Sequence, residues 1–241
     1  MNNVDLYESP KRKRKTPATQ RNKDHLSLNN GIRHKTEPQR QMMMEFEDGL
    51  NIVAYGSAGS GKSYIACYLA LKKLFDGNTS KIVIVRSAVQ VRSQGFLPGS
   101  LAEKSEVYTI PYKQIINELC DNGSAWDILT KKNMIEFIST SFVRGITLSD
   151  CVVIVDEFQN CDWYELSSVV TRAGEDCQIV FCGDTAQGDL FRTREKSGFD
   201  QFIKVIDRMP DYFASIKFLP QDIVRSGLVK KFIMVCEDMD V

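Results

Sequence analysis

Residues 56–63 have the residue types and spacing of a phosphate-binding P-loop, which is a glycine, four residues and then Gly-Lys-Ser. Glycines let backbone N–H groups close around phosphate oxygens, and a helix that begins at the loop adds partial positive charge there. We expect Lys62 to reach the β- and γ-phosphates and the Ser63 hydroxyl to occupy a Mg²⁺ position. The predicted phosphate-binding residues are Gly56, Ser57, Ala58, Gly59, Ser60, Gly61, Lys62 and Ser63.

The flanks of this loop predict the strand and the helix that it needs. Residues 50–55 form a short apolar run, and residues 64–75 carry apolar side chains along a helix. A glycine-rich turn that matched the pattern by chance would not need these neighbours. Nucleotide binding is therefore the first functional expectation.

Gln39 is a candidate contact for the adenine base. It lies just upstream of the P-loop, after Thr36 and Pro38, which are typical of a helix start. A side-chain amide both donates and accepts hydrogen bonds, so it can pair with adenine. An exposed helical glutamine is the alternative.

Two carboxylates, Asp156 and Glu157, end a second apolar run at residues 151–155. Behind a P-loop, the aspartate is expected to hold Mg²⁺ and the glutamate to orient or deprotonate the attacking water. A strand followed by an acidic helix cap is the structural alternative. A third run, residues 178–182, leads to Gln187, which we expect to sense the γ-phosphate or to position water.

Apolar strands alternate with helical segments along the chain, which predicts an α/β fold with a mainly parallel sheet covered on both faces. Polar residues follow the strands and collect at the carboxyl edge, where ligands bind in such sheets. Residues of about 101–133 are predicted to be a helical insertion, a candidate lid or subunit contact. Near the C-terminus, a helical face is expected to pack on the sheet; it comprises Val224, Leu228, Phe232 and Val235.

The charge is unevenly distributed. Ten of the 31 Lys and Arg residues but only four of the 31 Asp and Glu residues lie in residues 1–40. Residues 1–30 are predicted to be a basic, disordered tail ahead of one domain at residues 31–241. The basic run at residues 11–15 could neutralise nucleic-acid phosphates, act as a localisation signal or simply be solvated.

The cysteines and the hydropathy indicate a cytoplasmic protein. The seven cysteines form no Cys-x-x-Cys pair, so neither a disulfide framework nor a zinc site is expected. The chain has no apolar run of about 18 residues and no apolar core of a secretory signal near its start, so no membrane association is expected.

The order of these motifs resembles the ATPase core of superfamily 1 helicases and, more closely, the PhoH family of ATPases. The matching stretches are 56–63, 86–89, 95–99, 144–145 with 147–148, 156–157 with 159–160, 171–172, 183–184 with Gln187, 197–198 and 222–225. The resemblance implies a three-layer RecA-like P-loop NTPase fold and Mg²⁺-dependent ATP hydrolysis. It also implies a link to RNA, because some members carry a fused PIN ribonuclease domain. A further implication is assembly into a ring, which is often hexameric.

Two residues depart from the family pattern, since Ser87 stands where proline is usual and Ile146 where a second arginine is usual. Arg225 lies in a segment that resembles the helicase segment whose arginine contacts the γ-phosphate, so it is the first candidate for that role. Arg144 and Arg172 are second candidates, acting across a subunit boundary. For each arginine, a surface ion pair of little energetic consequence is the alternative.

The first functional hypothesis is an ATPase that binds and remodels single-stranded nucleic acid, with RNA favoured, as an oligomeric helicase. The alternative is an ATP-dependent switch or binding module with little turnover. A small-molecule kinase could share the P-loop, but the paired carboxylates and the Gly-Asp-x-x-Gln segment argue against it.

Overall fold

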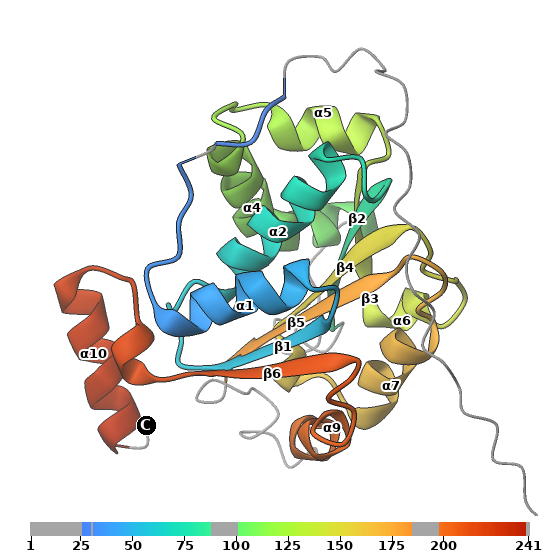
Figure 1. The fold of residues 1–241 in the computed structure, drawn as a ribbon. Coiled ribbons are helices and arrows are strands. Elements are labelled where there is room, and N and C mark those ends of the chain that lie inside the picture. Colours follow the sequence, from blue (N-terminus) through green and yellow to red (C-terminus); the bar gives the residue numbers. More distant parts are fainter. Residues whose placement is uncertain (1–25, 30, 88–100, 185–197, 240–241) are drawn as a thin grey trace, which may run out of the picture.

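The structure, a computed structural model, describes residues 26–29, 31–87, 101–184 and 198–239, with the backbone alone for 101–106 and 237. In this part of the chain a six-stranded sheet of order β3-β2-β4-β5-β1-β6 lies between two layers of helices (Figure 1). Every strand pairing is parallel, which confirms the predicted three-layer α/β fold. The strands are β1 (Asn51–Gly56), β2 (Lys81–Arg86), β3 (Ile135–Ser139), β4 (Cys151–Asp156), β5 (Gln178–Asp184) and β6 (Phe213–Phe218).

Alternate side chains of the buried strands face the two helical layers, because successive residues of a strand point to opposite faces. In β1, Ile52 and Ala54 belong to one core and Val53 to the other. The first layer consists of α1 (Glu37–Glu47), α2 (Lys62–Phe75), α4 (Leu101–Leu119) and α5 (Ala125–Lys131), and the second of α6 (Thr140–Val143), α7 (Trp163–Thr171) and α9 (Phe199–Ile206).

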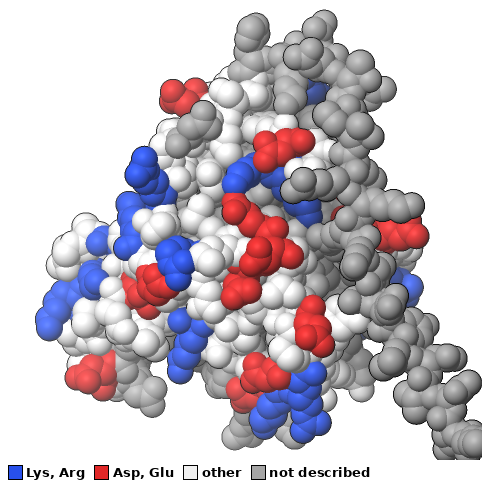
Figure 2. All heavy atoms as spheres, viewed as in Figure 1, with Lys and Arg blue, Asp and Glu red and all other residues white. Residues whose placement is uncertain are grey.

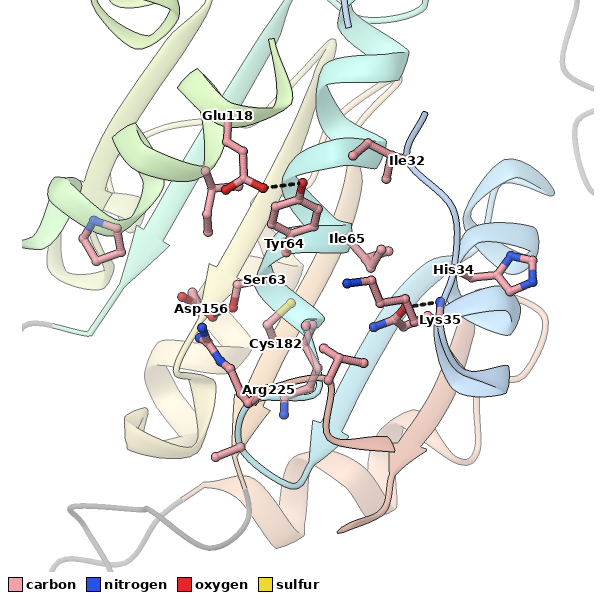
Figure 3. Close-up of a pocket in the computed structure, with 18 of the residues that line it drawn as sticks. Ile32, His34, Lys35, Ser63, Tyr64, Ile65, Glu118, Asp156, Cys182 and Arg225 are labelled. Atoms are coloured by element: carbon pink, nitrogen blue, oxygen red, sulfur yellow. Dashed lines mark hydrogen bonds between the residues drawn. The ribbon is translucent and has the colours of Figure 1, made fainter. Parts of the chain in front are cut away.

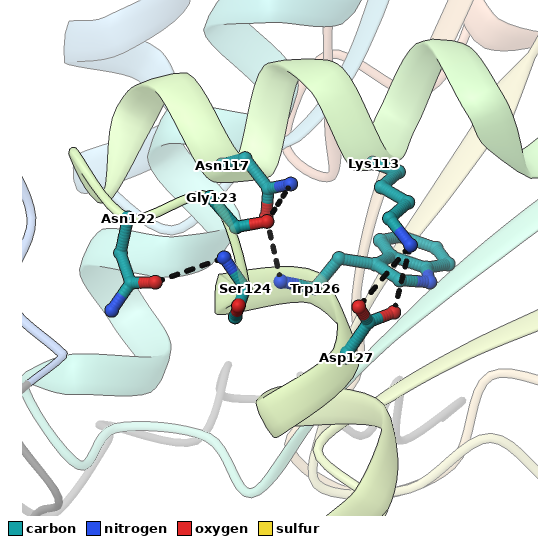
Figure 4. A network of polar contacts seen from close by, with 7 residues as sticks. All are labelled: Lys113, Asn117, Asn122, Gly123, Ser124, Trp126 and Asp127. Carbon is teal, nitrogen blue, oxygen red and sulfur yellow. Dashed lines mark hydrogen bonds and ion pairs between the residues drawn. The ribbon is translucent and has the colours of Figure 1, made fainter.

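The segment predicted as a helical insertion is the crossover connection from β2 to β3, and α4 and α5 belong to the first helical layer. Three side chains of α4 are buried in the core of that layer, namely Tyr112, Ile116 and Leu119. The two helices are joined by an ion pair between Lys113 and Asp127 at 3.0 Å (Figure 4). The segment is therefore needed to cover the sheet.

Four residues of the predicted N-terminal tail, 26–29, are described, and they contact the first helical layer. Leu26 and Leu28 pack against the first core, and the Asn29 N–H donates a hydrogen bond to the Leu119 carbonyl at 2.8 Å. The basic run at residues 11–15 lies outside the described residues. None of the helices that the structure describes is long and apolar enough to span a membrane.

The last helix, α10 (Gly227–Met239), does not pack as predicted. Leu228 is 82% exposed and Phe232 is 68% exposed, and Val235 is also exposed. In Figure 1 the helix projects beyond the edge strand β6 instead of lying on the sheet. Helical spacing identifies the apolar face of α10, but it does not identify which part of the protein that face packs against.

This position of α10 predicts the effect of two matched substitutions. Phe181→Ala should lower the free energy of unfolding by about 3–5 kcal/mol, because Phe181 is fully buried in β5. Phe232→Ala should change it by less than about 0.5 kcal/mol, because the ring is mostly exposed. Urea unfolding followed by circular dichroism measures both. A similar large loss in both variants would contradict the described position of α10.

The end of β1 allows a second prediction. Gly56 has φ +124°, and a Cβ there would lie 1.9 Å from the Phe218 carbonyl oxygen of β6. Gly56→Ala should therefore cost about 3 kcal/mol or more of stability. Gly77, with φ +74° and open space around it, is the matched control and should cost only about 1–2 kcal/mol as alanine. Thermal unfolding of the two variants measures the difference, and equal losses would show that the close approach to β6 is not the cause.

Candidate nucleotide-binding site

A cavity of about 800 Å³ lies at the carboxyl edge of the sheet. The P-loop and the ends of β4 and β5 form its floor, and α4 forms one wall (Figure 3). The segment that precedes α1 forms the opposite wall with Ile32, His34 and Lys35. These elements are far apart in the sequence, and the parallel sheet brings them to one edge.

The P-loop holds Lys62 against its own backbone. The Lys62 Nζ donates to the Ser57 carbonyl at 2.8 Å, to the Gly56 carbonyl at 3.1 Å and to the Ser60 Oγ at 3.2 Å. Burial lowers the pKa of Lys62, and nearby carboxylates, led by Asp184, oppose that effect. The lysine is therefore a buried cation in the loop, as the phosphate-binding prediction requires.

Ser63 and Asp156 meet across the floor of the cavity. The Ser63 Oγ, at the start of α2, donates to the Asp156 Oδ1 at 2.8 Å, and the Tyr112 hydroxyl donates to the Oδ2 at 2.6 Å. Within the described ranges, no group of three or more His, Cys, Asp and Glu residues could hold a metal ion. A Mg²⁺ at this point would fit, because this ion is usually held by one or two protein oxygens together with water and phosphate oxygens.

Glu157 also lines the cavity, held in the left-handed backbone region with φ +56°. The Gln159 Nε2 donates to its Oε2 at 2.6 Å, and the Arg86 guanidinium lies 3.9 Å from its Oε1. Burial raises the pKa of Glu157, the neighbouring Asp156 raises it further, and Arg86 opposes both. Glu157 is the N-cap residue of the following 3₁₀ turn, η1 (Phe158–Asn160), but its side chain forms no capping hydrogen bond.

Gln39 is buried beside the P-loop, so the alternative of an exposed glutamine is wrong. Its Oε1 accepts a hydrogen bond from the Lys35 N–H at 2.7 Å, and its Nε2 donates to the Ser60 carbonyl at 2.8 Å. The amide thus ties the wall of the cavity to the loop. One N–H and one lone pair remain for a base, because a side-chain amide offers two of each.

The structure separates the three candidate arginines. Arg225 lines the cavity, and its Cγ would lie 2.8 Å from a Cβ added at Gly59. The Val224 N–H donates to the Gly59 carbonyl at 3.1 Å, which fixes this segment against the P-loop. Arg144 and Arg172 are exposed and do not line the cavity. The Arg172 carbonyl accepts from the Leu148 N–H, ahead of β4 and thus near the opposite edge of the sheet.

Sequence reasoning did not assign Tyr112 or Arg86 to the site. Arg86 is the last residue of β2 and lies at the ligand-binding edge, so its position in the sequence could have predicted that it belongs to the site. Tyr112 lies within a helix, and no spacing rule links it to a carboxylate 44 residues away. Gln187 and the residues 88–100 lie outside the described residues.

The comparisons with known proteins identify the family. A family model described as "PhoH-like protein" matches residues 31–237. The PhoH-like protein of Bacillus subtilis (strain 168) is 33% identical over 206 residues, which make up 84% of this chain and 63% of that protein. Protein PhoH of Escherichia coli (strain K12) is 29% identical over 199 residues, which make up 82% of this chain and 56% of that protein. This chain thus spans less than two thirds of either relative.

Among solved structures, the Pif1 helicase from Candida albicans is similar with a TM-score of 0.45 and 17% identity, over 87% of this chain and 44% of that chain. The family match carries the assignment, because it extends over most of the chain. It includes the P-loop, the Asp156-Glu157 pair and Arg225. The chain therefore belongs to the PhoH-like protein family, whose members are P-loop NTPases.

Proposed function

We propose that this protein hydrolyses ATP with Mg²⁺ and uses the reaction to bind or remodel single-stranded nucleic acid, with RNA favoured. The observation that carries the proposal is the hydrogen bond of 2.8 Å between Ser63 and Asp156. It joins the P-loop to the end of β4, beside the buried Lys62, in one cavity. This is the arrangement that a P-loop NTPase needs for a nucleotide phosphate and its metal.

The residues of the cavity divide into four roles in this proposal. Lys62 and the loop N–H groups bind the phosphates, while Ser63 and Asp156 hold Mg²⁺. When bound, Mg²⁺ neutralises charge on the phosphate oxygens. Glu157 orients the attacking water and accepts its proton, a task that suits a carboxylate whose pKa is raised. Gln39 lies where it could contact the base.

Arg225 is the arginine that we propose for the γ-phosphate, because it lines the same cavity. Arg144 and Arg172 could reach a nucleotide only from a neighbouring copy, because neither lines the cavity of its own chain. The family resemblance supports a homo-oligomer, often a hexameric ring, in which clefts between subunits would take the place of a second ATPase core.

The nucleic-acid part of the proposal is supported by the family resemblance and not by a basic surface. On the face shown in Figure 2, the described Lys and Arg side chains are interspersed with Asp and Glu. Outside residues 1–40 the chain has more acidic than basic residues. We therefore expect modest affinity that falls as the salt concentration rises.

The proposal is tested by steady-state ATP hydrolysis with Mg²⁺, with and without single-stranded RNA or DNA. Lys62→Ala should lower kcat roughly 100-fold or more, because it removes the cation at the phosphates. Glu157→Gln should lower it roughly 100- to 10,000-fold, because the amide cannot accept the proton. Lys72→Ala is the matched control, because Lys72 lies on the same helix but forms an exposed ion pair with Glu47, and it should stay within about twofold.

The nucleic-acid arm separates the hypotheses. RNA-stimulated hydrolysis that disappears in both active-site variants would support the proposal. Hydrolysis that neither RNA nor DNA changes would contradict the nucleic-acid part. ATP binding without turnover would favour the nucleotide-dependent switch.

A further inference from the structure

Tyr112 is a buried tyrosine to which the proposed reaction gives no role. It lies in the middle of α4, and its side chain is 1% exposed. Its hydroxyl donates to the Asp156 Oδ2 at 2.6 Å. A buried tyrosine hydroxyl needs a partner, and here the partner is the carboxylate assigned to the metal.

The packing of α4 does not explain why this residue carries a hydroxyl. Ile116 and Leu119 anchor the same helix in the core, and both are fully buried. Phenylalanine would fill the same space, and the Tyr112 ring lies 6.0 Å from the Phe137 ring, a contact that phenylalanine would also make. The hydroxyl therefore serves the carboxylate.

The two oxygens of Asp156 are held by donors from two different elements. Ser63 of α2 donates to Oδ1 at 2.8 Å, and Tyr112 of α4 donates to Oδ2 at 2.6 Å. Two donors on the two oxygens fix the plane of the carboxylate, because rotation about its terminal torsion would lengthen both bonds. That torsion is otherwise broad and poorly defined.

We propose that Tyr112 is a positioning residue that orients Asp156 for the divalent cation, so that α4 becomes part of the metal site. The inference rests on the proposed function, because that function places the cation at Asp156. With a cation held by Ser63 and Asp156, the Tyr112 hydroxyl would still hold the Oδ2 of Asp156. Partners of this kind, outside the direct ligands, typically change metal affinity or activity roughly 10- to 100-fold.

A consequence is that the geometry of the metal site would depend on the position of the crossover helix α4. The α4 helix follows β2 and Arg86, whose guanidinium lies 3.9 Å from Glu157 and 5.8 Å from the ring of Tyr108 on α4. A shift of α4 would therefore move a donor on Asp156 and a cation–ring contact beside Glu157 at the same time.

The test measures metal binding without turnover. Mn²⁺, which also favours oxygen ligands, is titrated into the full chain with ADP, and free Mn²⁺ is measured by electron paramagnetic resonance. Tyr112→Phe should raise the Kd of Mn²⁺ roughly 10-fold or more. The affinity for ADP in EDTA, measured by calorimetry, should stay unchanged. In an Asp156→Ala background, Tyr112→Phe should add nothing, because it acts through that carboxylate.

Tyr64→Phe is the matched control. The Tyr64 hydroxyl donates to Glu118 at 3.0 Å, so its loss likewise removes one tyrosine hydrogen bond involving α4, in this case with α2, but leaves Asp156 untouched. Its Kd for Mn²⁺ should stay within about twofold.

Three results would overturn the inference. They are an unchanged Kd for Mn²⁺ in Tyr112→Phe, an equal rise in both tyrosine variants, and a loss of folding or of metal-free ADP binding in Tyr112→Phe. The last would show that the hydroxyl serves the fold instead of the cation. If the parent chain bound neither ADP nor Mn²⁺, the proposed function itself would fail, which is a distinct outcome.

Discussion

The site depends on one constraint, the register of a parallel sheet. Gly56 at the end of β1 pairs with Asp184 at the end of β5, and Asp156 at the end of β4 pairs with Cys182 of β5. The ends of β1 and β5 are therefore level, and β4 ends slightly earlier along β5, which places the P-loop beside Asp156 and Asp184. The hydrogen bond from Ser63 to Asp156 closes this arrangement. Shifting any of these strands by one residue would turn its side chains to the other face.

This edge concentrates buried charge, which is unfavourable for folding. Lys62, Asp156 and Asp184 are all buried there, and burial lowers the pKa of Lys62 and raises that of the adjacent Glu157. Buried charges are retained where they are paired or needed for chemistry. The chain stabilises them with donors from several elements, including Tyr112 of the crossover helix. The helical layer that contains α4 thus serves both the core and the site.

The sequence allowed the sheet and the carboxylates to be predicted, because apolar runs of strand length that end in polar residues are a local pattern. The position of Asp156 follows from such a run. Tyr112 could not be found in this way, because its contact with Asp156 depends on how a crossover helix packs. The placement of α10 and the anchoring of Leu26 and Leu28 also depend on tertiary neighbours, which helical spacing and composition do not specify.

The central claim, that this cavity binds a nucleoside triphosphate together with Mg²⁺, is tested most directly by calorimetric titration with a non-hydrolysable ATP analogue. The account predicts one nucleotide bound per chain. It also predicts that binding weakens roughly 10-fold or more when Mg²⁺ is removed or Ser63 is replaced by alanine, because a ligand of the ion is then lost. Failure to bind, or binding that is indifferent to both changes, would contradict it.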